Sequence, residues 1–416
     1  MTVNYRGTLI CFFVSTLLLS ALMSGCSMLG GKRDETPKIE MIVENPLPIK
    51  RTDEFVVLKV AQLKEMAPNF SQDMFIVLQA GSNEEIPYQV DDMDNDGELD
   101  EIAMVMDMEP GEQKRIVIRY APSNSPESRA VRIGYEKRTR AAMHPEYKGI
   151  GWESELVAYR IYPDYRNSIS VFGKQEPGLS LDKFAASLDG FSKLQPWGVS
   201  VLDGGKSLGC GGFGIWHDGE LMKPMSDGAA SYTRIAADGP IRAAVQVIHD
   251  NWRVGDQTLR VTATYSIFAG QRWTRSEVKI EGANNPVKVA AGLMKSEAAK
   301  LTRDDKDGLL YTWGEQSHRD TPDSLGMAMI YPTESFESFH DDRDSGAYLT
   351  VLNPGADNEI AYWSLAAWSS GEIGIKREKQ FTELASSIGR RLKHPLTVTI
   401  MPVQLPPAEG EPQETN

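Results

Sequence analysis

Alternating apolar and polar residues dominate the second half of the sequence and limit the folds open to it. Apolar residues occupy every second position over 241–247, and residues 259–267 and 273–280 repeat the pattern. A period of two places successive side chains on opposite faces of a strand, so each strand packs one face in a core. We find no convincing long amphipathic helix in the sequence. The pattern therefore predicts a large antiparallel β-sandwich over residues 127–404.

Short β-rich runs separated by turn residues fill the first part of the chain. Examples are residues 55–58, 75–78 and 115–120. Strands at this spacing are typical of a small β-sandwich, which we place over residues 39–121. A chain of 416 residues is long enough for both domains. The predicted fold class is all-β, a small N-terminal β-sandwich followed by a large antiparallel one.

The first 26 residues resemble a bacterial lipoprotein signal. Arg6 precedes an apolar stretch over 9–22, which is short for a bilayer span and ends in Met23-Ser24-Gly25-Cys26. We expect Cys26 to carry lipid and to anchor an exported protein, by resemblance in the outer membrane. An uncleaved anchor helix is the alternative. Residues 27–38 read as a tether and residues 405–416 as a disordered tail.

Charge and cysteine content exclude several classes of function. Lys and Arg number 44 against 58 Asp and Glu, a net charge of −14. We therefore expect no nucleic-acid partner, because such binding needs clustered cations. Cys11 lies in the signal, so Cys210 is the one cysteine left beside Cys26, and an internal disulfide is excluded. Between glycines, Cys210 is better explained as a small buried residue than as a nucleophile.

An Asp-rich segment resembles a calcium loop. Carboxylates at alternating positions and Gly97 at the turn suit a hard cation. The expected ligands are Asp92, Asp94, Asp96, the carbonyl of Glu98, and Asp100. Ala103 stands where such loops carry a bidentate Glu, so a plain acidic hairpin loop is an equal alternative. A bound calcium ion would be structural, and we expect no catalytic cofactor.

Aromatic and arginine residues alternate over 152–167. If this segment is extended, one face carries Trp152, Ser154, Arg160, Tyr162, Asp164 and Arg166. Such a face suits an acidic sugar, because guanidinium groups bind carboxylates with two hydrogen bonds. A salt-bridged outer sheet face is the alternative. A weaker version of the pattern contains Trp273, Arg275, Glu277 and Lys279.

Two histidines are the better candidates for acid–base chemistry. His217 and His318 lie in polar or glycine-rich segments, whereas His249 falls on the apolar side of its strand and is expected in the core. We expect further substrate contacts from a wider set of polar and aromatic residues. These are Trp152, Glu153, Asp164, Asn167, Trp197, Lys206 and Trp216.

Several short motifs resemble a family of exported bacterial lipoproteins found among polysaccharide-utilisation genes. They are Val90-Asp91-Asp92, Asp96-Gly97, Asp100-Glu101, Gly151-Trp152-Glu153-Ser154, Tyr159-Arg160, Tyr162, Arg166-Asn167, Phe172-Gly173-Lys174 and Gly205-Lys206-Ser207-Leu208-Gly209. The resemblance covers nearly the whole mature chain. It implies a sandwich similar to those of galactose mutarotases and polysaccharide lyases. One similar protein is a dehydratase acting on unsaturated uronic-acid ends of ulvan oligosaccharides.

These observations favour a lyase or dehydratase acting on an acidic oligosaccharide. Such an enzyme removes a proton next to a carboxylate, so it needs cations, a base and an acid. We assign Arg160 and Arg166 to the carboxylate, His318 or Tyr162 to the base and His217 to the acid. A non-catalytic glycan-binding lipoprotein and a mutarotase-like isomerase are the alternatives.

Overall fold

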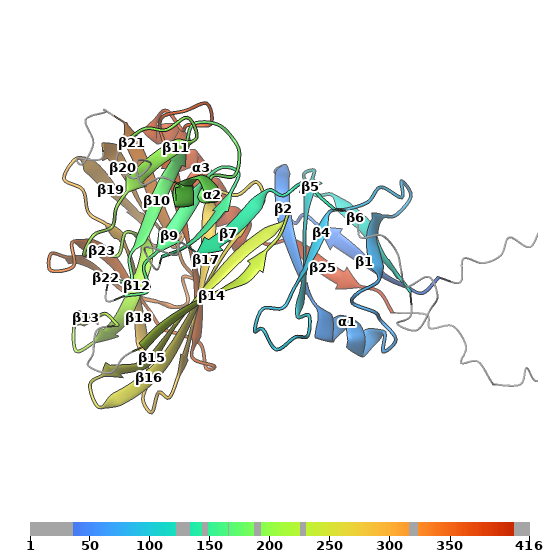
Figure 1. Cartoon of the computed structure of the whole chain (residues 1–416), viewed down its shortest axis with the longest axis horizontal. Coiled ribbons are helices and arrows are strands. Elements are labelled where there is room, and N and C mark those ends of the chain that lie inside the picture. Colours follow the sequence, from blue (N-terminus) through green and yellow to red (C-terminus); the bar gives the residue numbers. More distant parts are fainter. Residues whose placement is uncertain are drawn as a thin grey trace, which may run out of the picture. The chain divides into compact units, whose positions relative to one another are not determined.

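The computed structural model describes residues 36–121, 134–143, 149–164, 166–186, 193–224, 230–315 and 323–402 (Figure 1). Within these ranges the chain consists mainly of antiparallel strands, and the all-β prediction is confirmed. The predicted signal with Cys26 and the predicted tail over 405–416 lie outside the described residues.

The small sandwich is built from two sheets and one short helix. Its first sheet has the order β25 (Thr397–Ile400), β1 (Lys38–Glu44), β6 (Gln113–Tyr120) and β3 (Phe75–Gln79). Its second sheet has the order β2 (Arg51–Lys59), β5 (Glu101–Met108) and β4 (Tyr88–Asp91). Met41, Ile118, Met104 and, from α1 (Val60–Met66), Leu63 are buried in its core.

The small sandwich includes a strand that the sequence analysis placed in the large domain. β25 pairs antiparallel with β1, matching Met41 with Ile400 and Glu44 with Thr397. The predicted range 127–404 for the large domain is therefore wrong at its C-terminal end. Pairing between strands some 350 residues apart leaves no local signal in the sequence, and β25 is only four residues long.

The large sandwich has an eight-stranded sheet on one side. Its order is β14 (Ala230–Asp238), β15 (Arg242–Val254), β16 (Gln257–Phe268), β17 (Trp273–Glu281), β24 (Glu359–Trp368), β21 (Ser324–Ile330), β20 (Leu309–Glu315) and β19 (Ala299–Asp304). Ala243, Val245 and Val247 are buried, as the alternation predicted. His249 is also buried, which confirms its expected place in the core.

Two five-stranded sheets form the other side. One has the order β11 (Gly198–Leu202), β10 (Ile169–Lys174), β9 (Ala158–Ile161), β8 (Ile150–Ser154) and β7 (Thr139–Met143). The other has the order β13 (Glu220–Met222), β12 (Cys210–His217), β18 (Lys288–Met294), β23 (Ala347–Leu352) and β22 (Phe336–Asp342). A bridge between Ile169 and Gly209 joins them, and both pack against the eight-stranded sheet in one core.

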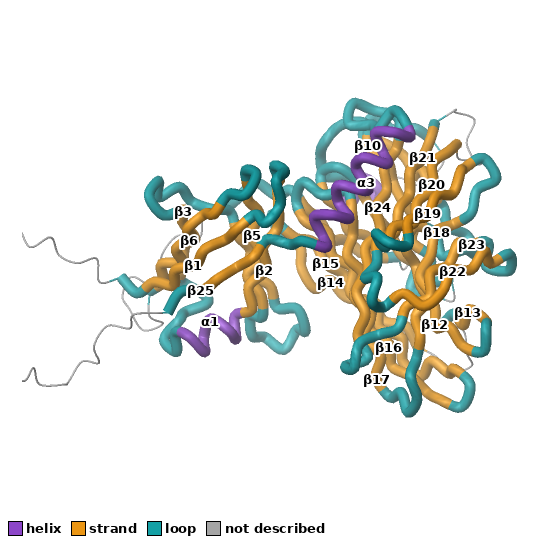
Figure 2. Tube along the Cα trace, turned by 180° about the vertical axis from the view of Figure 1, so that it is seen from behind, coloured by secondary structure: helices purple, strands orange, loops and turns teal. Residues whose placement is uncertain are grey.

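Two helices lie on the large sandwich, α2 (Leu181–Ala186) and α3 (Glu378–Lys393). α3 packs on β20 and β21, and Figure 2 shows it in purple along the strands. Phe381 sits over Gly326, where a side chain would collide with its ring. The expectation that the chain contains no long amphipathic helix is wrong, because α3 is one. Phe381, Ala385 and Ile388 carry the helical spacing and are buried.

The thiol of Cys210 is buried and its sulfur approaches the carbonyl of Leu365 at 3.6 Å. Burial raises the pKa of this thiol well above its usual range. A buried neutral thiol agrees with the structural role expected for Cys210. Among the described residues, no helix is both long and apolar enough to cross a membrane.

Candidate functional site

Two guanidinium groups face one aromatic ring at the end of β9. The Cζ atom of Arg160 lies 4.3 Å from the centre of the Tyr162 ring, and that of Arg166 lies 4.1 Å from it. We call Arg160, Tyr162, Asp164 and Arg166 the Tyr162 cluster. The structure thus brings together four of the predicted site residues: the ring contacts both arginines, and Asp164 pairs with Arg166.

A tight turn after β9 holds this arrangement. Pro163 cannot continue the strand ladder, and Asn167 has a positive φ of 45°. The carboxylate of Asp164 accepts the backbone N–H of Arg166 at 2.9 Å and two bonds from its guanidinium, at 3.0 Å and 2.6 Å. The Nδ2 of Asn167 donates to the carbonyl of Phe213 at 2.8 Å, which fixes the turn to β12.

Arg160 is almost fully buried, whereas Arg166 is partly exposed. Burial lowers the pKa of the Arg160 guanidinium, and the positive charge of Arg166 lowers it further, while Tyr162 and Asp203 oppose the change. Removing a cation from water next to a second cation is costly. A carboxylate brought to this place would offset part of that cost.

Arg160 lies on the outer face of its sheet, and Trp152 does not share that face. β8 pairs with β9 so that Trp152 is opposite Tyr159 and Gly151 is opposite Arg160. The indole of Trp152 is fully buried in the sandwich core, stacks on Tyr265 and donates to Thr274 at 2.8 Å. The predicted substrate contact of Trp152 is wrong, because the chain reverses between the two strands and shifts the alternation.

The predicted substrate contacts of Glu153 and Asn167 are also wrong. Glu153 is fully buried, forms a 2.5 Å ion pair with Lys174, and accepts bonds from the backbone N–H groups of Ser180 and Leu181. Asn167 is fully buried against β12. Neither side chain is accessible to a substrate in this conformation, and both hold the local backbone in place.

Two more predicted residues lie near the Tyr162 cluster. Trp197 packs with Phe172, whose ring centre lies 5.3 Å from the Cζ of Arg160. Lys206 is exposed, and its carbonyl accepts the ammonium of Lys223. Burial lowers the pKa of Lys223, and Asp342 and Asp164 oppose the change. Lys223 therefore links the Lys206 loop to the cluster.

Phe172, Asp203 and Lys223 were not predicted to lie near the Tyr162 cluster. Phe172 was quoted in a motif, but its approach to Arg160 depends on the pairing of β9 with β10. Asp203 and Lys223 come from other strand ends. No local pattern marks such residues, because only the sheet order brings them near Tyr162.

Of the two histidines predicted for catalysis, the described one, His217, does not lie at the cluster. His217 is at the far end of β12, 3.3 Å from Asp218 and beside Gly255. The ring of the predicted substrate contact Trp216 is tilted against that of His340, with the ring centres 4.4 Å apart. Four residues of extended strand, about 13 Å, separate His217 from Phe213, where the cluster's turn is attached. His318 lies outside the described residues.

The residues of the weaker aromatic–charged pattern, Trp273, Arg275, Glu277 and Lys279, lie in different surroundings. Trp273 is buried, and its indole donates to Gln271 at 2.8 Å. Lys279 is exposed and pairs with Glu359 at 3.2 Å. Arg275 and Glu277 lie in a cavity on the outer face of the eight-stranded sheet.

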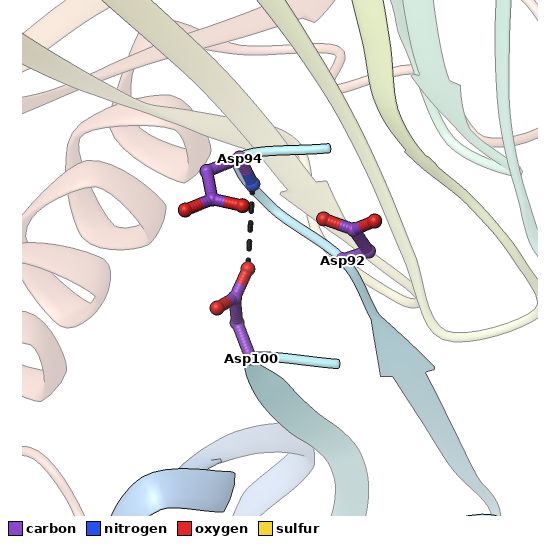
Figure 3. Close-up of side chains that lie close together, drawn as sticks. All are labelled: Asp92, Asp94 and Asp100. Carbon is purple, nitrogen blue, oxygen red and sulfur yellow. Dashed lines mark hydrogen bonds between the residues drawn. The ribbon is translucent and has the colours of Figure 1, made fainter. Parts of the chain in front are cut away.

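The Asp-rich segment forms a hairpin loop between β4 and β5. Side-chain oxygens of Asp92, Asp94 and Asp100 lie within 4.8 Å of one another (Figure 3). Asp100 accepts the backbone N–H groups of Met93 at 2.6 Å and Asp94 at 3.3 Å. These three carboxylates are the hard oxygen ligands that calcium prefers.

The fourth predicted carboxylate, that of Asp96, lies apart from these three, and the carbonyl of Glu98 stays a prediction. The carboxylate of Asp96 accepts the N–H of Glu98 at 2.8 Å and is not among the converging oxygens. The side chain of Glu98 turns toward Gln72 and Lys64. Glu101, the carboxylate that follows the loop, pairs instead with Arg242 at 2.5 Å.

Comparison with known proteins places the chain in a family. A model described as a domain of unknown function (DUF4861) matches residues 43–398. The chain belongs to this family. No curated protein matches it. The family description states no activity.

Two solved structures that the chain matches come from Enterococcus faecalis. One is a protein in glycosyl hydrolase family 38, with 8% identity, a TM-score of 0.49, and coverage of 88% of this chain and 47% of that one. Another is an alpha-mannosidase from strain V583, with 10% identity, a TM-score of 0.48, and coverage of 88% and 46%. This chain spans about half the length of either structure.

Proposed function

We propose that the protein is a carbohydrate-active enzyme that binds a uronic-acid oligosaccharide at the Tyr162 cluster. The observation that carries the proposal is the pair of guanidinium groups on one aromatic ring, at 4.3 and 4.1 Å. A sugar carboxylate can accept hydrogen bonds from such groups, and the apolar face of a sugar ring packs on an aromatic surface. Trp197, which is half-buried, extends that surface, and the buried ring of Phe172 lies beneath Arg160.

The reaction proposed is the elimination of water or a sugar from the uronic-acid ring. A base removes the proton from the carbon next to the carboxylate, the electron pair forms a double bond, and the C–O bond at the next carbon breaks. The departing oxygen takes a proton and leaves as a hydroxyl compound or water. Arg160 and Arg166 stabilise the negative charge that develops on the carboxylate.

Tyr162 is the base in this proposal, because its ring contacts both groups that hold the carboxylate. His318 stays a predicted alternative. The acid is not assigned to His217, since the structure does not place that side chain at the cluster.

One observation favours a binding protein without catalysis. The carboxylate of Asp164 already occupies the guanidinium of Arg166. Arg166 would then orient the ring of Tyr162 while Arg160 alone meets the sugar acid. An aromatic surface with one cation is sufficient for glycan binding and needs no base.

The test uses the full-length protein and a panel of uronic-acid oligosaccharides with saturated ends, which carry the proton that the reaction removes, and with unsaturated ends. Turnover is followed by ultraviolet absorbance and mass, and affinity by calorimetry. Arg160→Ala should lose both, and Tyr162→Phe should lose turnover while keeping most of the affinity. Arg260→Ala is the matched control, because Arg260 is an exposed arginine paired with Asp250 at 2.7 Å on β16.

Binding without turnover in the wild type would replace the enzyme by the binding protein. Equal turnover by wild type and Arg160→Ala would remove the site assignment altogether. Turnover that survives in Tyr162→Phe would exclude this residue as the base and direct attention to His318.

We also propose export and lipid attachment at Cys26, on the strength of the N-terminal sequence. Cys26→Ala should move the protein from the membrane fraction to the soluble fraction and remove a lipid-sized mass. Unchanged fractionation and mass would exclude lipid attachment.

A further inference from the structure

The cavity that contains Arg275 and Glu277, of about 470 Å³, lies on the outer face of the eight-stranded sheet. Residues of β2 from the small sandwich and of the C-terminal end of α3 line its walls, and β16, β17 and β24 line its floor. This volume is in the range of small-molecule sites. We call it the β17 cavity.

The floor of the β17 cavity is one row across three strands. Ser266 is paired with Arg275, and Arg275 with Trp363. The next residues along these strands, among them Tyr265 and Tyr362, are buried in the sandwich core, so this row faces outward. A hydroxyl, a guanidinium and an indole therefore lie side by side.

The charges that line the β17 cavity are already paired with one another. Arg275 contacts Glu277 at 2.7 Å, Arg391 contacts Glu54 at 2.7 Å, and Glu101 binds both Arg242 and Lys59. An entering carboxylate would have to displace a carboxylate of the protein. A sugar hydroxyl, in contrast, accepts from a guanidinium and donates to a carboxylate at the same time.

The aromatic residues of the β17 cavity suit a ring with an apolar face. Phe55 and Phe268 stack with their centres 4.5 Å apart, and Trp363 lies on the floor. The Nε1 of Trp363 is shielded from solvent and has no hydrogen-bond partner among the residues that the structure describes. An oxygen-rich ligand supplies acceptors for such a donor.

We propose that the β17 cavity binds a neutral monosaccharide or disaccharide. It is a second saccharide site, chemically distinct from the Tyr162 cluster, where a cation meets an acidic sugar. Trp363 provides the platform, and the Arg275–Glu277 pair binds neighbouring hydroxyl groups.

The test titrates the full-length protein with methyl glycosides of glucose, galactose, xylose and rhamnose, and with glucuronate as the acidic probe. At least one neutral glycoside should bind more tightly than glucuronate to the Arg160→Ala variant, in which the Tyr162 cluster is disabled. Trp363→Ala should weaken that binding at least tenfold, and Trp363→Phe should retain part of it, because a ring remains.

A matched pair on β17 tests the charged wall. Glu277→Gln should weaken neutral binding several-fold, whereas Glu281→Gln should leave it unchanged. Glu281 is on the same strand and face but is exposed and contacts Arg260 at 3.6 Å, outside the cavity. If Trp363→Ala fails to fold, this pair decides the outcome.

The proposal is overturned if none of the neutral glycosides binds, or if folded Trp363→Ala binds them like the wild type. Equal effects of Glu277→Gln and Glu281→Gln would also overturn it. Loss of neutral binding in Arg160→Ala alone would place the sugar at the Tyr162 cluster. Failure here leaves the proposed function standing, since that function depends on acidic substrates.

Discussion

Two groups of charged residues lie on one face of the β7–β11 sheet and differ in how their charges are paired and exposed. Glu153 and Lys174 are fully buried, and the N–H groups of Ser180 and Leu181 complete the hydrogen bonding of the carboxylate. In the Tyr162 cluster, Arg160 and Arg166 share an aromatic ring, and Arg166 remains partly exposed. The comparison teaches that charge in a strand motif does not identify a site. The local partners decide whether a charged side chain serves folding or binding.

The largest effect is expected from breaking the buried pair. Glu153→Gln leaves the ammonium of Lys174 buried without its counter-ion, which typically costs about 3–5 kcal/mol. The free energy of unfolding in urea measures this loss, and Glu281→Gln is the control on an exposed pair. Adding Lys174→Met to Glu153→Gln should restore much of the stability. A selective loss of oligosaccharide affinity in stable Glu153→Gln would contradict the structural role.

The Asp-rich loop extends the comparison to carboxylates whose partner would come from solution. If calcium binds there, it stabilises the folded state by about 2.7 kcal/mol at a hundredfold excess over its dissociation constant. A chelator should then lower the melting temperature of the wild type. The double variant Asp94→Ala, Asp96→Ala should no longer respond. Identical melting curves with and without chelator would leave the acidic-hairpin interpretation.

A smaller effect, on function instead of folding, is expected at the Tyr162 cluster. Arg160→Ala should lower kcat/KM for an acidic oligosaccharide about ten- to a hundredfold, because a charge-assisted contact contributes roughly 1.5–3 kcal/mol. Arg160→Lys should restore only part of the lost kcat/KM, since an ammonium group cannot form two parallel hydrogen bonds with a carboxylate. The contrast between the two groups of residues fails if Arg160→Ala loses as much stability as Glu153→Gln and keeps its specificity for acidic substrates.

The smallest effect concerns the ion pair inside the Tyr162 cluster. Asp164→Asn removes a carboxylate that competes for Arg166, so affinity for acidic oligosaccharides should rise a few-fold, most at low salt. Calorimetry at two salt concentrations measures the change. Weaker binding would indicate that Asp164 itself contacts the sugar, which is the role that the sequence predicted for it.

The sequence predicted strand faces well where a strand is long and one-sided. Val245 and His249 lie in the core as expected. The face assignment failed at Trp152, because a turn between β8 and β9 cannot be seen in an alternating pattern that continues through it. The pairing of Glu153 with Lys174 depends on the order of three strands, and no local spacing encodes it. α3 was missed although its apolar residues have helical spacing, because polar residues and Gly389 surround them.

The pairing of β25 with β1 has a consequence for the order of folding. β1 lies between β6 and β25, so one of its edges stays open until the chain has been made nearly to its described C-terminal end. An open strand edge is a template for unwanted pairing with other chains. Every described strand of the large sandwich precedes β25 in the chain, so the small sandwich is the last of the two to be completed. Closure of the small sandwich thus requires that the chain has been made through β25.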